Sequence, residues 1–207
     1  FKPSHIIDFM GQGMVAQSWD DPTLWYETNL AKKSYILESI KNLKSLEKYI
    51  RASTPEVYGS SELKQKEEAH FCPSTPYAVS HSAIDYHLRC LGKNYNFPYI
   101  IGRFSNFYGE GQQLYRVIPK SILSLLNGKI FTIDGNGKSL RSFIHSDDIC
   151  AAFCAAISLA PYAPTGESVG CGFDLRYEDA LLLTVIGITV SSYIFATIPA
   201  AAEIDLL

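Results

Sequence analysis

The sequence is poor in charged residues and has no excess of basic ones, and both shortages exclude classes of function. Only 19% of the 207 residues are charged while 47% are hydrophobic. This balance is typical of a folded globular chain and argues against a disordered one. The formal net charge is −3 and the pI is about 6.0, so we expect no broad basic face for nucleic acid. A phosphate-bearing substrate would have to be bound by a few individual Arg or Lys side chains.

Cysteine is present without a spacing that implies a disulfide framework or a metal site. The five cysteines are an odd number, and only Cys150 and Cys154 are close in sequence, with no His or second Cys pair beside them. We expect these two to be small apolar core residues on one helix face, without a bound metal. The pattern favours a reducing, cytoplasmic compartment.

The N-terminal region lacks the features of a targeting segment. No basic stretch followed by an apolar run is present, so we expect no signal peptide. Because the chain starts at Phe1 and not at Met, we also expect the sequence to be cut at this end.

Apolar runs of strand length alternate with helical patterns through most of the chain, which predicts parallel βαβ units. The expected strands are 5–10, 48–53, 99–104, 131–133 and 142–145. The expected helices are 22–43, 77–94, 115–126 and 147–160. Asp21 followed by Pro22, and Thr75 followed by Pro76, are the start signals of the first two helices. Residues 54–76 are predicted to form a long polar loop.

The composition changes after Gly172. Residues 180–202 contain no charged side chain and reach the length of a membrane span. They include Thr, Ser and Gly, and no Lys or Arg cluster flanks them. A shifted or unrelated terminus, or a buried helix or strand pair, is therefore favoured over a membrane helix. We divide the chain into a domain at 1–172 and an atypical hydrophobic tail at 173–207.

Two groups of polar side chains are candidates for chemistry. Tyr77 and His81 are four residues apart on a predicted helix, so they project from one face. The segment STPEVYG, which contains Thr54 and Glu56, directly follows a predicted strand. Ligands of open parallel sheets bind at the carboxyl ends of strands, so these groups are expected to converge there. Taken alone, the Tyr77–His81 pair would be a surface pair and Glu56 a solvated carboxylate.

The order of several segments makes a family resemblance specific. FMGQGMVAQSWDDPTLWYETN, STPEVYG, PYAVSH, GRFSNFYGEGQ and RSFIHSDDI occur in the order and approximate spacing of the extended short-chain dehydrogenases. The chain resembles the NAD-dependent epimerase/dehydratase family, most closely nucleoside-diphosphate-sugar 4,6-dehydratases of the dTDP-glucose or GDP-mannose type. The resemblance implies an α/β fold, a Rossmann-like doubly wound parallel sheet that binds NAD, with NADP as an alternative.

The resemblance also implies that this chain is a fragment. The family's first βαβ units and their Gly-rich phosphate-binding turn have no counterpart here, because Gly11 and Gly13 follow a later strand. We therefore expect the chain by itself to bind NAD poorly or not at all and to be inactive.

The resemblance assigns catalytic roles to four residues. Tyr77 would remove the proton from the sugar C4 hydroxyl, Thr54 would hydrogen-bond the reacting oxygen, and Glu56 would remove the C5 proton. Loss of C6 water and return of the hydride would follow. The family has Lys at position 81, where it lowers the pKa of the Tyr and holds the cofactor ribose. His81 is shorter and mostly neutral at pH 7, so a catalytically impaired relative is an alternative.

The remaining implied contacts surround the cofactor and the substrate. Arg103, Phe104 and Ser105 would face the nicotinamide side, while Asn106, Arg116 and Arg141 would bind the substrate diphosphate or nucleotide. A surface position is an equal alternative for Arg116. A sugar-nucleotide epimerase or decarboxylase is the second functional candidate. A homodimer through helices 22–43 and 77–94 is possible by analogy, and membrane association is not expected.

Overall fold

The computed structural model describes residues 2–60, 70–132 and 143–159. Its described residues form two compact units, one from the N-terminus to Phe104 together with the chain from Ala152 onward, the other from Ser105 to Ala151. Two predictions concern residues outside the described ones, namely Arg141 and the hydrophobic tail at 173–207.

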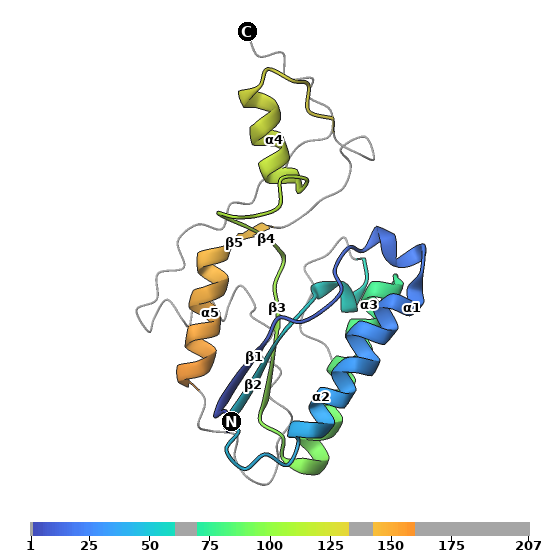
Figure 1. The fold of residues 1–207 in the computed structure, drawn as a ribbon, viewed down its shortest axis with the longest axis vertical. Helices are drawn as coiled ribbons and strands as arrows, with labels where there is room; N and C mark the ends of the chain where they lie inside the picture. Colours follow the sequence, from blue (N-terminus) through green and yellow to red (C-terminus); the bar gives the residue numbers. More distant parts are fainter. Residues whose placement is uncertain (1, 61–69, 133–142, 160–207) are drawn as a thin grey trace. The chain divides into compact units, whose positions relative to one another are not determined.

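A parallel sheet organises the first unit (Figure 1). Its described strands are β1 (His5–Asp8), β2 (Lys48–Ser53) and β3 (Tyr99–Arg103), in the order β1-β2-β3. The register aligns Ile7 with Ile50, and Ile50 with Ile100. Since all strands run the same way, their carboxyl ends lie along one edge. The predicted strands at 5–10, 48–53 and 99–104 are confirmed, the first and last with ends one or two residues earlier.

Two long helical segments connect these strands. The first begins with α1 (Pro22–Trp25), continues as a π-helix, η2 (Tyr26–Lys32), and ends as α2 (Lys33–Ile40). Asp21 caps it as predicted, accepting a hydrogen bond from the Thr23 amide at 3.1 Å. The predicted end at residue 43 is wrong, because the chain turns after Ile40 and the Leu43 amide donates to the Ile40 carbonyl.

The second long helix is α3 (Pro76–Tyr95), whose start at Thr75-Pro76 was predicted. The Thr75 hydroxyl accepts from the Ala78 amide at 3.1 Å, and Asn96 ends the helix in the left-handed conformation. The segment between β2 and α3 is not wholly a loop as predicted. It contains a 3-10 helix, η3 (Pro55–Tyr58), which Thr54 caps; another 3-10 helix, η1 (Ala16–Trp19), precedes α1.

Alternation along the strands separates two faces of the sheet. Tyr49 of β2 and Tyr99 and Ile101 of β3 point to the face covered by α2 and α3. This face holds the main core cluster, which comprises Leu37, Leu46, Tyr49, Ile84, Leu88, Leu91, Phe97, Tyr99 and Ile101. The helices contribute residues at three- and four-residue spacing, as an amphipathic helix requires.

The opposite face is covered by the later part of α5 (Ser146–Leu159). Phe153 packs with Phe9 and Phe104 at ring-centroid distances of 4.8 and 5.2 Å. A small pocket on this face is lined by Ile50, Ile100, Gly102, Phe104, Ala152, Phe153 and Ala156. Helices on both faces make the sheet doubly wound (Figure 1).

The second unit contains a parallel pair, β4 (Asn106–Tyr108) with β5 (Phe143–His145), and the helix α4 (Val117–Leu126). The sequence predicted β5 and α4 but not β4. A predicted strand at 131–133 is wrong for Phe131 and Thr132, which have no strand partner, and Ile133 lies outside the described residues. Apolar residues alone do not make a strand without a neighbour to pair with.

Two predictions about α5 also need correction. The helix begins at Ser146, one residue before the predicted start at 147, so Asp147 lies in its first turn. Cys150 and Cys154 are exposed, and Ile149 and Phe153 form the buried side instead. The four-residue spacing does place the two cysteines on one face of the helix, but that face is exposed. The buried face carries the residues one position earlier, which are rotated by about 100° around the helix axis.

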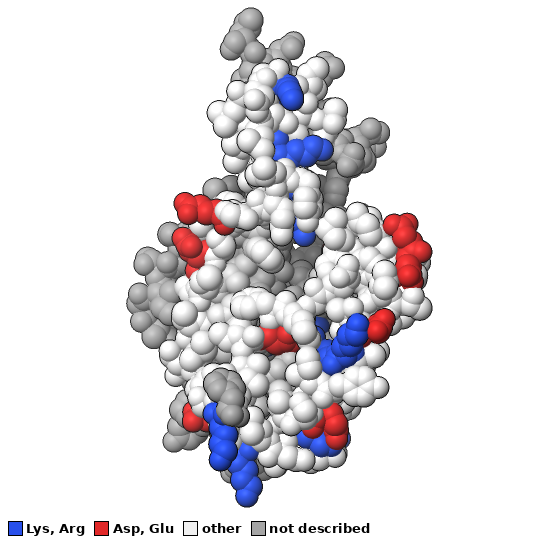
Figure 2. Space-filling view, in the orientation of Figure 1, with Lys and Arg blue, Asp and Glu red and all other residues white. Residues whose placement is uncertain are grey.

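The surface agrees with the low charge of the sequence. On the face drawn in Figure 2, the described Lys, Arg, Asp and Glu side chains occur in small separate groups, without a broad field of one sign. Among the described helices, none is both long and apolar enough to cross a membrane.

Candidate active site

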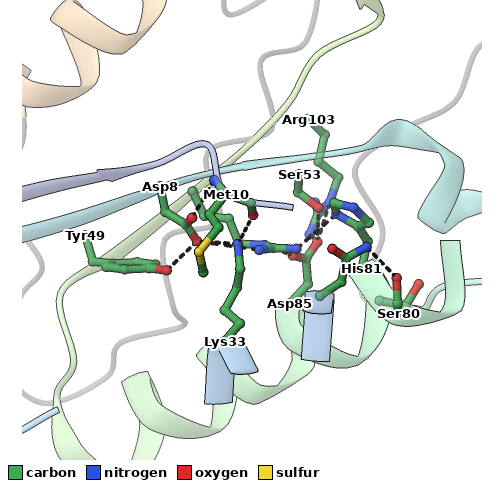
Figure 3. A network of polar contacts seen from close by, with 12 residues as sticks. Asp8, Met10, Lys33, Tyr49, Ser53, Ser80, His81, Asp85 and Arg103 are labelled. Carbon is green, nitrogen blue, oxygen red and sulfur yellow. Dashed lines mark hydrogen bonds and ion pairs between the residues drawn. The ribbon is translucent and has the colours of Figure 1, made fainter. Parts of the chain in front are cut away.

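Charged side chains gather at the carboxyl ends of the strands, on the face covered by α2 and α3 (Figure 3). Strand alternation places Asp8, Arg51, Ser53 and Arg103 on this face, as it does Tyr49. The helices add Lys33, His81 and Asp85. We call these eight residues the strand-end network. They are buried, except for the half-buried Ser53, so their charges must be satisfied by one another.

Asp85 of α3 is the acceptor on one side of the network. Its carboxylate accepts from Arg51 Nε at 2.9 Å and from Ser53 Oγ at 2.8 Å. Arg103 adds two donors, Nε at 3.0 Å and Nη2 at 2.9 Å. Two guanidinium groups on one fully buried carboxylate tie β2 and β3 to α3.

Asp8 of β1 is the acceptor on the other side. It accepts from Lys33 Nζ at 2.6 Å and from the Tyr49 hydroxyl, and Arg51 Nη1 lies 3.7 Å away. Burial, with the nearby Arg51 charge, lowers the pKa of Lys33 to about 8 despite its pairing with Asp8. Burial beside Asp8 raises the pKa of Tyr49, so this phenol stays protonated.

His81 joins the network through one ring nitrogen. Its Nδ1 lies 3.0 Å from Arg51 Nη2, and only 6% of the residue is exposed. Burial and the charges of Arg51 and Lys33 hold the pKa of His81 well below the ordinary value of 6.5. The imidazole is therefore neutral at physiological pH, as the sequence led us to expect.

Tyr77 lies directly beside His81, one helical turn earlier. The two rings are 4.6 Å apart between centroids and inclined by 49°, which confirms that both project from one face of α3. Tyr77 is half-buried, and its amide donates to Ser18 Oγ at 3.2 Å, so η1 supports the start of the helix. A phenol held at a helix start next to an imidazole can donate or accept a proton at a bound ligand.

The turn that carries Thr54 and Glu56 contacts the same helix. Thr54 Oγ1 accepts from the Glu56 amide at 3.3 Å, which leaves its hydroxyl proton available to an oxygen of a ligand. Gly59 ends the turn with a φ of 78°, and a Cβ there would lie 2.3 Å from the Cys72 carbonyl oxygen. The turn and the chain entering α3 are further joined by the Cys72 amide, which donates to the Val57 carbonyl.

The other predicted residues are distributed differently. Phe104 lies in the first unit and packs against Phe153. Ser105, Asn106 and Arg116 belong to the second unit, where Asn106 starts β4 and the exposed Arg116 immediately precedes α4 and lies over the Tyr115 ring. Arg103 lies within the strand predicted at 99–104. It ends β3, and its guanidinium is buried against Asp85 and the Tyr58 hydroxyl.

Most of the strand-end network was missed at the sequence level. Asp8, Lys33, Tyr49, Arg51 and Asp85 lie far apart in the sequence, and no single motif contains them. A signal was available, because charged residues interrupt apolar strands at Asp8 and Arg51 and a charged residue, Asp85, lies on the buried stripe of α3. Buried charges of opposite sign are normally paired.

The described residues fit one part of a nicotinamide cofactor. His81 Nε2 has no hydrogen-bond partner within the part of the chain that the structure describes. A Cβ on the exposed Gly11 would lie 3.9 Å from this nitrogen, so the bare glycine leaves room at the ring edge. A hydrogen-bonding imidazole nitrogen beside a phenol suits the hydroxyl groups of a ribose ring. Among the described residues, no group of His, Cys, Asp and Glu could hold a metal ion.

Sequence comparison identifies similar proteins. A model described as the NAD dependent epimerase/dehydratase family matches residues 1–172. A dTDP-D-glucose 4,6-dehydratase of Dictyostelium discoideum is 35% identical over 160 residues, covering 72% of this chain and 37% of the relative. A human protein of the same description is 35% identical over 145 residues, covering 69% and 41%. The chain thus spans about two fifths of the length of these relatives.

Solved structures show the same fold. A dTDP-glucose 4,6-dehydratase of Streptomyces venezuelae with NAD and TYD bound has a TM-score of 0.71 at 25% identity, covering 89% of this chain and 57% of that one. A UDP-glucuronic acid 4-epimerase mutant of Bacillus cereus, in complex with UDP-4-deoxy-4-fluoro-glucuronic acid and NAD, has a TM-score of 0.70 at 26% identity, covering 75% of this chain and 49% of that one. These likenesses confirm the α/β, Rossmann-like fold predicted from the sequence.

Proposed function

This chain belongs to the NAD-dependent epimerase/dehydratase family, and we propose that the whole protein is a nucleoside-diphosphate-sugar 4,6-dehydratase. The observation that carries the proposal is the Thr54–Glu56 turn. This turn carries a hydroxyl and a carboxylate, and it contacts the helix that bears Tyr77. Two relatives that are 35% identical to this chain over 160 and 145 aligned residues are described as dTDP-D-glucose 4,6-dehydratases, which favours dehydration over other reactions of the family.

In this proposal, Tyr77 and Thr54 act at the C4 oxygen. Tyr77 takes the hydroxyl proton and Thr54 donates a hydrogen bond that holds the oxygen in place. NAD, when bound, would supply the acceptor and the source of the transferred hydride. Tyr77 and His81 would hold the ribose beside it, with Phe104 and Ser105 on the nicotinamide side.

Glu56 distinguishes the proposed reaction from simple oxidation. Once C4 is a ketone, the C5–H bond is acidified, and a carboxylate can remove that proton. The C6 hydroxyl then leaves with a proton as water, and addition of the hydride at C6 and of a proton at C5 completes a reaction whose net change is the loss of one water. Glu56 is half-buried in the first turn of η3.

Three further side chains would bind the substrate diphosphate and nucleotide. We assign this role to Asn106, Arg116 and Arg141, because an amide and guanidinium groups are suited to phosphate oxygens. We also propose a homodimer through the helices α1, α2 and α3. Their exposed apolar side chains include Leu24, Tyr35, Ile36, Val79 and Tyr86.

The test uses the whole protein with a nucleoside-diphosphate glucose and NAD. Glu56→Gln should lower product formation by about 10²- to 10⁴-fold, the usual contribution of a general base, and should also stop exchange of the C5 hydrogen with deuterated solvent. Tyr77→Phe should block formation of reduced cofactor as well. Glu47→Gln, an exposed carboxylate before β2, is the matched control and should leave the rate unchanged. Full deuterium exchange at C5 in the Glu56→Gln variant would refute the assignment.

A sugar-nucleotide 4-epimerase or decarboxylase is the second candidate. The likeness to UDP-glucuronic acid 4-epimerases favours the first of these. Analysis of the products distinguishes these reactions from dehydration, since an epimerase retains the C6 oxygen and a decarboxylase releases carbon dioxide.

A further inference from the structure

The two ring nitrogens of His81 have different surroundings. Nδ1 is 3.0 Å from Arg51 Nη2 inside the protein. Nε2 has no hydrogen-bond partner among the described residues and lies on the side of Gly11. The ring is held from a third direction by Tyr77. Such an arrangement restricts where the imidazole proton can be.

A guanidinium group only donates hydrogen bonds. Arg51 is charged at every physiological pH and has no lone pair to offer, so Nδ1 must accept. An accepting Nδ1 cannot carry a proton. The neutral imidazole must therefore carry its single proton on Nε2, the nitrogen without a protein partner.

The charges around the ring oppose a second proton. Arg51 of β2 and Lys33 of α2 are the cations that act on it, and burial adds to their effect. The nearby carboxylates are occupied, because Asp85 already accepts from Arg51 and Arg103, and Asp8 from Lys33. Arg51, Lys33 and Tyr77 act on or touch the ring directly, and the other charged or titratable groups of the network on the surrounding elements are Asp8, Tyr49, Asp85 and Arg103.

We propose that Arg51 is a positioning residue that fixes His81 as the neutral Nε2–H tautomer, so that His81 offers a hydrogen-bond donor, not a positive charge, to a ligand oxygen beside Tyr77. The ligand class is a hydroxyl or carbonyl oxygen that approaches over Gly11. This ligand role rests on the proposed function, whereas the tautomer does not.

Substitution of His81 by Lys is then not a simple repair. The change removes the acceptor of Arg51 and adds a third cation next to Arg51 and Lys33. We expect His81→Lys to destabilise the fold and not to restore cofactor binding, in contrast to what the family resemblance alone would suggest.

The tautomer is tested by nitrogen NMR of the 207-residue chain labelled with ¹⁵N in its imidazole rings. The His81 resonances are assigned by their loss in His81→Asn, with His87→Gln on the same helix as the matched assignment control. Between pH 5.5 and 8, we expect Nδ1 to remain unprotonated and Nε2 to remain protonated, while a model histidine peptide in the same tube titrates. A protonated Nδ1, or a His81 that titrates with the peptide, would overturn the proposal.

Two variants test the acceptor role of His81 Nδ1 and the donor role of His81 Nε2 separately. The amide of Asn can place an oxygen near the Nδ1 position, so His81→Asn keeps the acceptor for Arg51 and loses the donor. The amide of Gln can place an NH₂ group near Nε2, so His81→Gln keeps the donor and loses the acceptor. Circular dichroism and thermal unfolding establish whether each variant folds.

The ligand role is tested by calorimetric titration of NAD into the whole protein. We expect His81→Asn to weaken binding by about tenfold, the effect of one lost hydrogen bond, and His81→Gln to bind within about threefold of the unchanged protein. The reverse order, or equal losses, would overturn the donor role. If a variant fails to fold, the NMR measurement on the unchanged chain still decides the tautomer. Failure of the dehydratase assay would affect neither the NMR result nor the NAD titration.

Discussion

At the scale of single residues, Asp85 is the carboxylate on which the strand-end network depends. It is completely buried and accepts from Arg51, Ser53 and Arg103. Two cations surround it, so its negative charge offsets the cost of burying theirs. The loss of one partner would therefore leave the charges of the others buried and uncompensated.

Asp85→Asn should therefore be strongly destabilising. The change leaves Arg51 and Arg103 without their carboxylate, and breaking a buried pair costs about 3–5 kcal/mol. Chemical denaturation monitored by circular dichroism measures the loss. Glu38→Gln, which removes the partner of Lys41 in an ion pair at the end of α2, is the control and should change stability far less than Asp85→Asn does. Similar losses for both variants would contradict the role of Asp85.

The residues of the proposed chemistry depend on the network in different ways. Thr54 and Glu56 are held by local backbone geometry, in a capped 3-10 turn that ends at Gly59. His81 is held by a guanidinium from another strand. A change in the network should consequently affect His81 and its neighbour Tyr77 more than the Thr54–Glu56 turn.

At the scale of elements, the π-helix η2 presents Asn29 to two other segments. Asn29 Oδ1 accepts from the Gln12 amide at 2.6 Å, and Nδ2 donates to the Gln12 carbonyl and to Ser80 Oγ at 3.1 and 3.0 Å. The Trp25 indole of α1 donates to the Gly13 carbonyl at 2.8 Å. The chain after β1 is thus fastened to the helices, which positions Gly11 next to His81.

Asn29→Ala should release the segment after β1. Gln12 loses its side-chain partner on both backbone groups, and Ser80 loses one donor, at a cost of about 1–3 kcal/mol. Hydrogen exchange of the Gln12 amide should accelerate far more than exchange in β2. Asn42→Ala, at an exposed position after α2, is the control. Unchanged protection of the Gln12 amide would show that Asn29 does not hold this segment.

At the scale of the whole molecule, burial of a neutral His81 links stability to pH. In the unfolded chain a histidine has a pKa of about 6.5, whereas in the folded chain the pKa of His81 is well below that value. Below pH 6.5, the unfolded state binds a proton that the folded state excludes. The free energy of unfolding must therefore decrease as the pH falls, and this group has no effect above that range.

The expected slope from His81 is up to about 1.4 kcal/mol per pH unit below pH 6.5. Urea unfolding between pH 5 and 8 measures it. His81→Asn, which retains an acceptor for Arg51, should lack this contribution, so the difference between the two curves isolates it. Parallel curves over the whole range would mean that His81 is not kept neutral by the fold.

The sequence by itself determined the elements and the order of the site segments. Capping residues such as Asp21 and Thr75, strand-length apolar runs and four-residue spacing act locally, so they are visible without coordinates. For this reason, the strands 48–53 and 99–104, the start of α3 and the pairing of Tyr77 with His81 were predicted correctly.

The tertiary structure alone decided which charges meet and which faces are buried. The spacing of Cys150 and Cys154 cannot tell which side of α5 packs, and the residues of the strand-end network come from β1, α2, β2, α3 and β3. The protonation of His81 likewise depends on Arg51, which is 30 residues away in the sequence and 3.0 Å away in space. Electrostatic interactions act over distance in space, whereas sequence patterns report distance along the chain, and only folding converts one into the other.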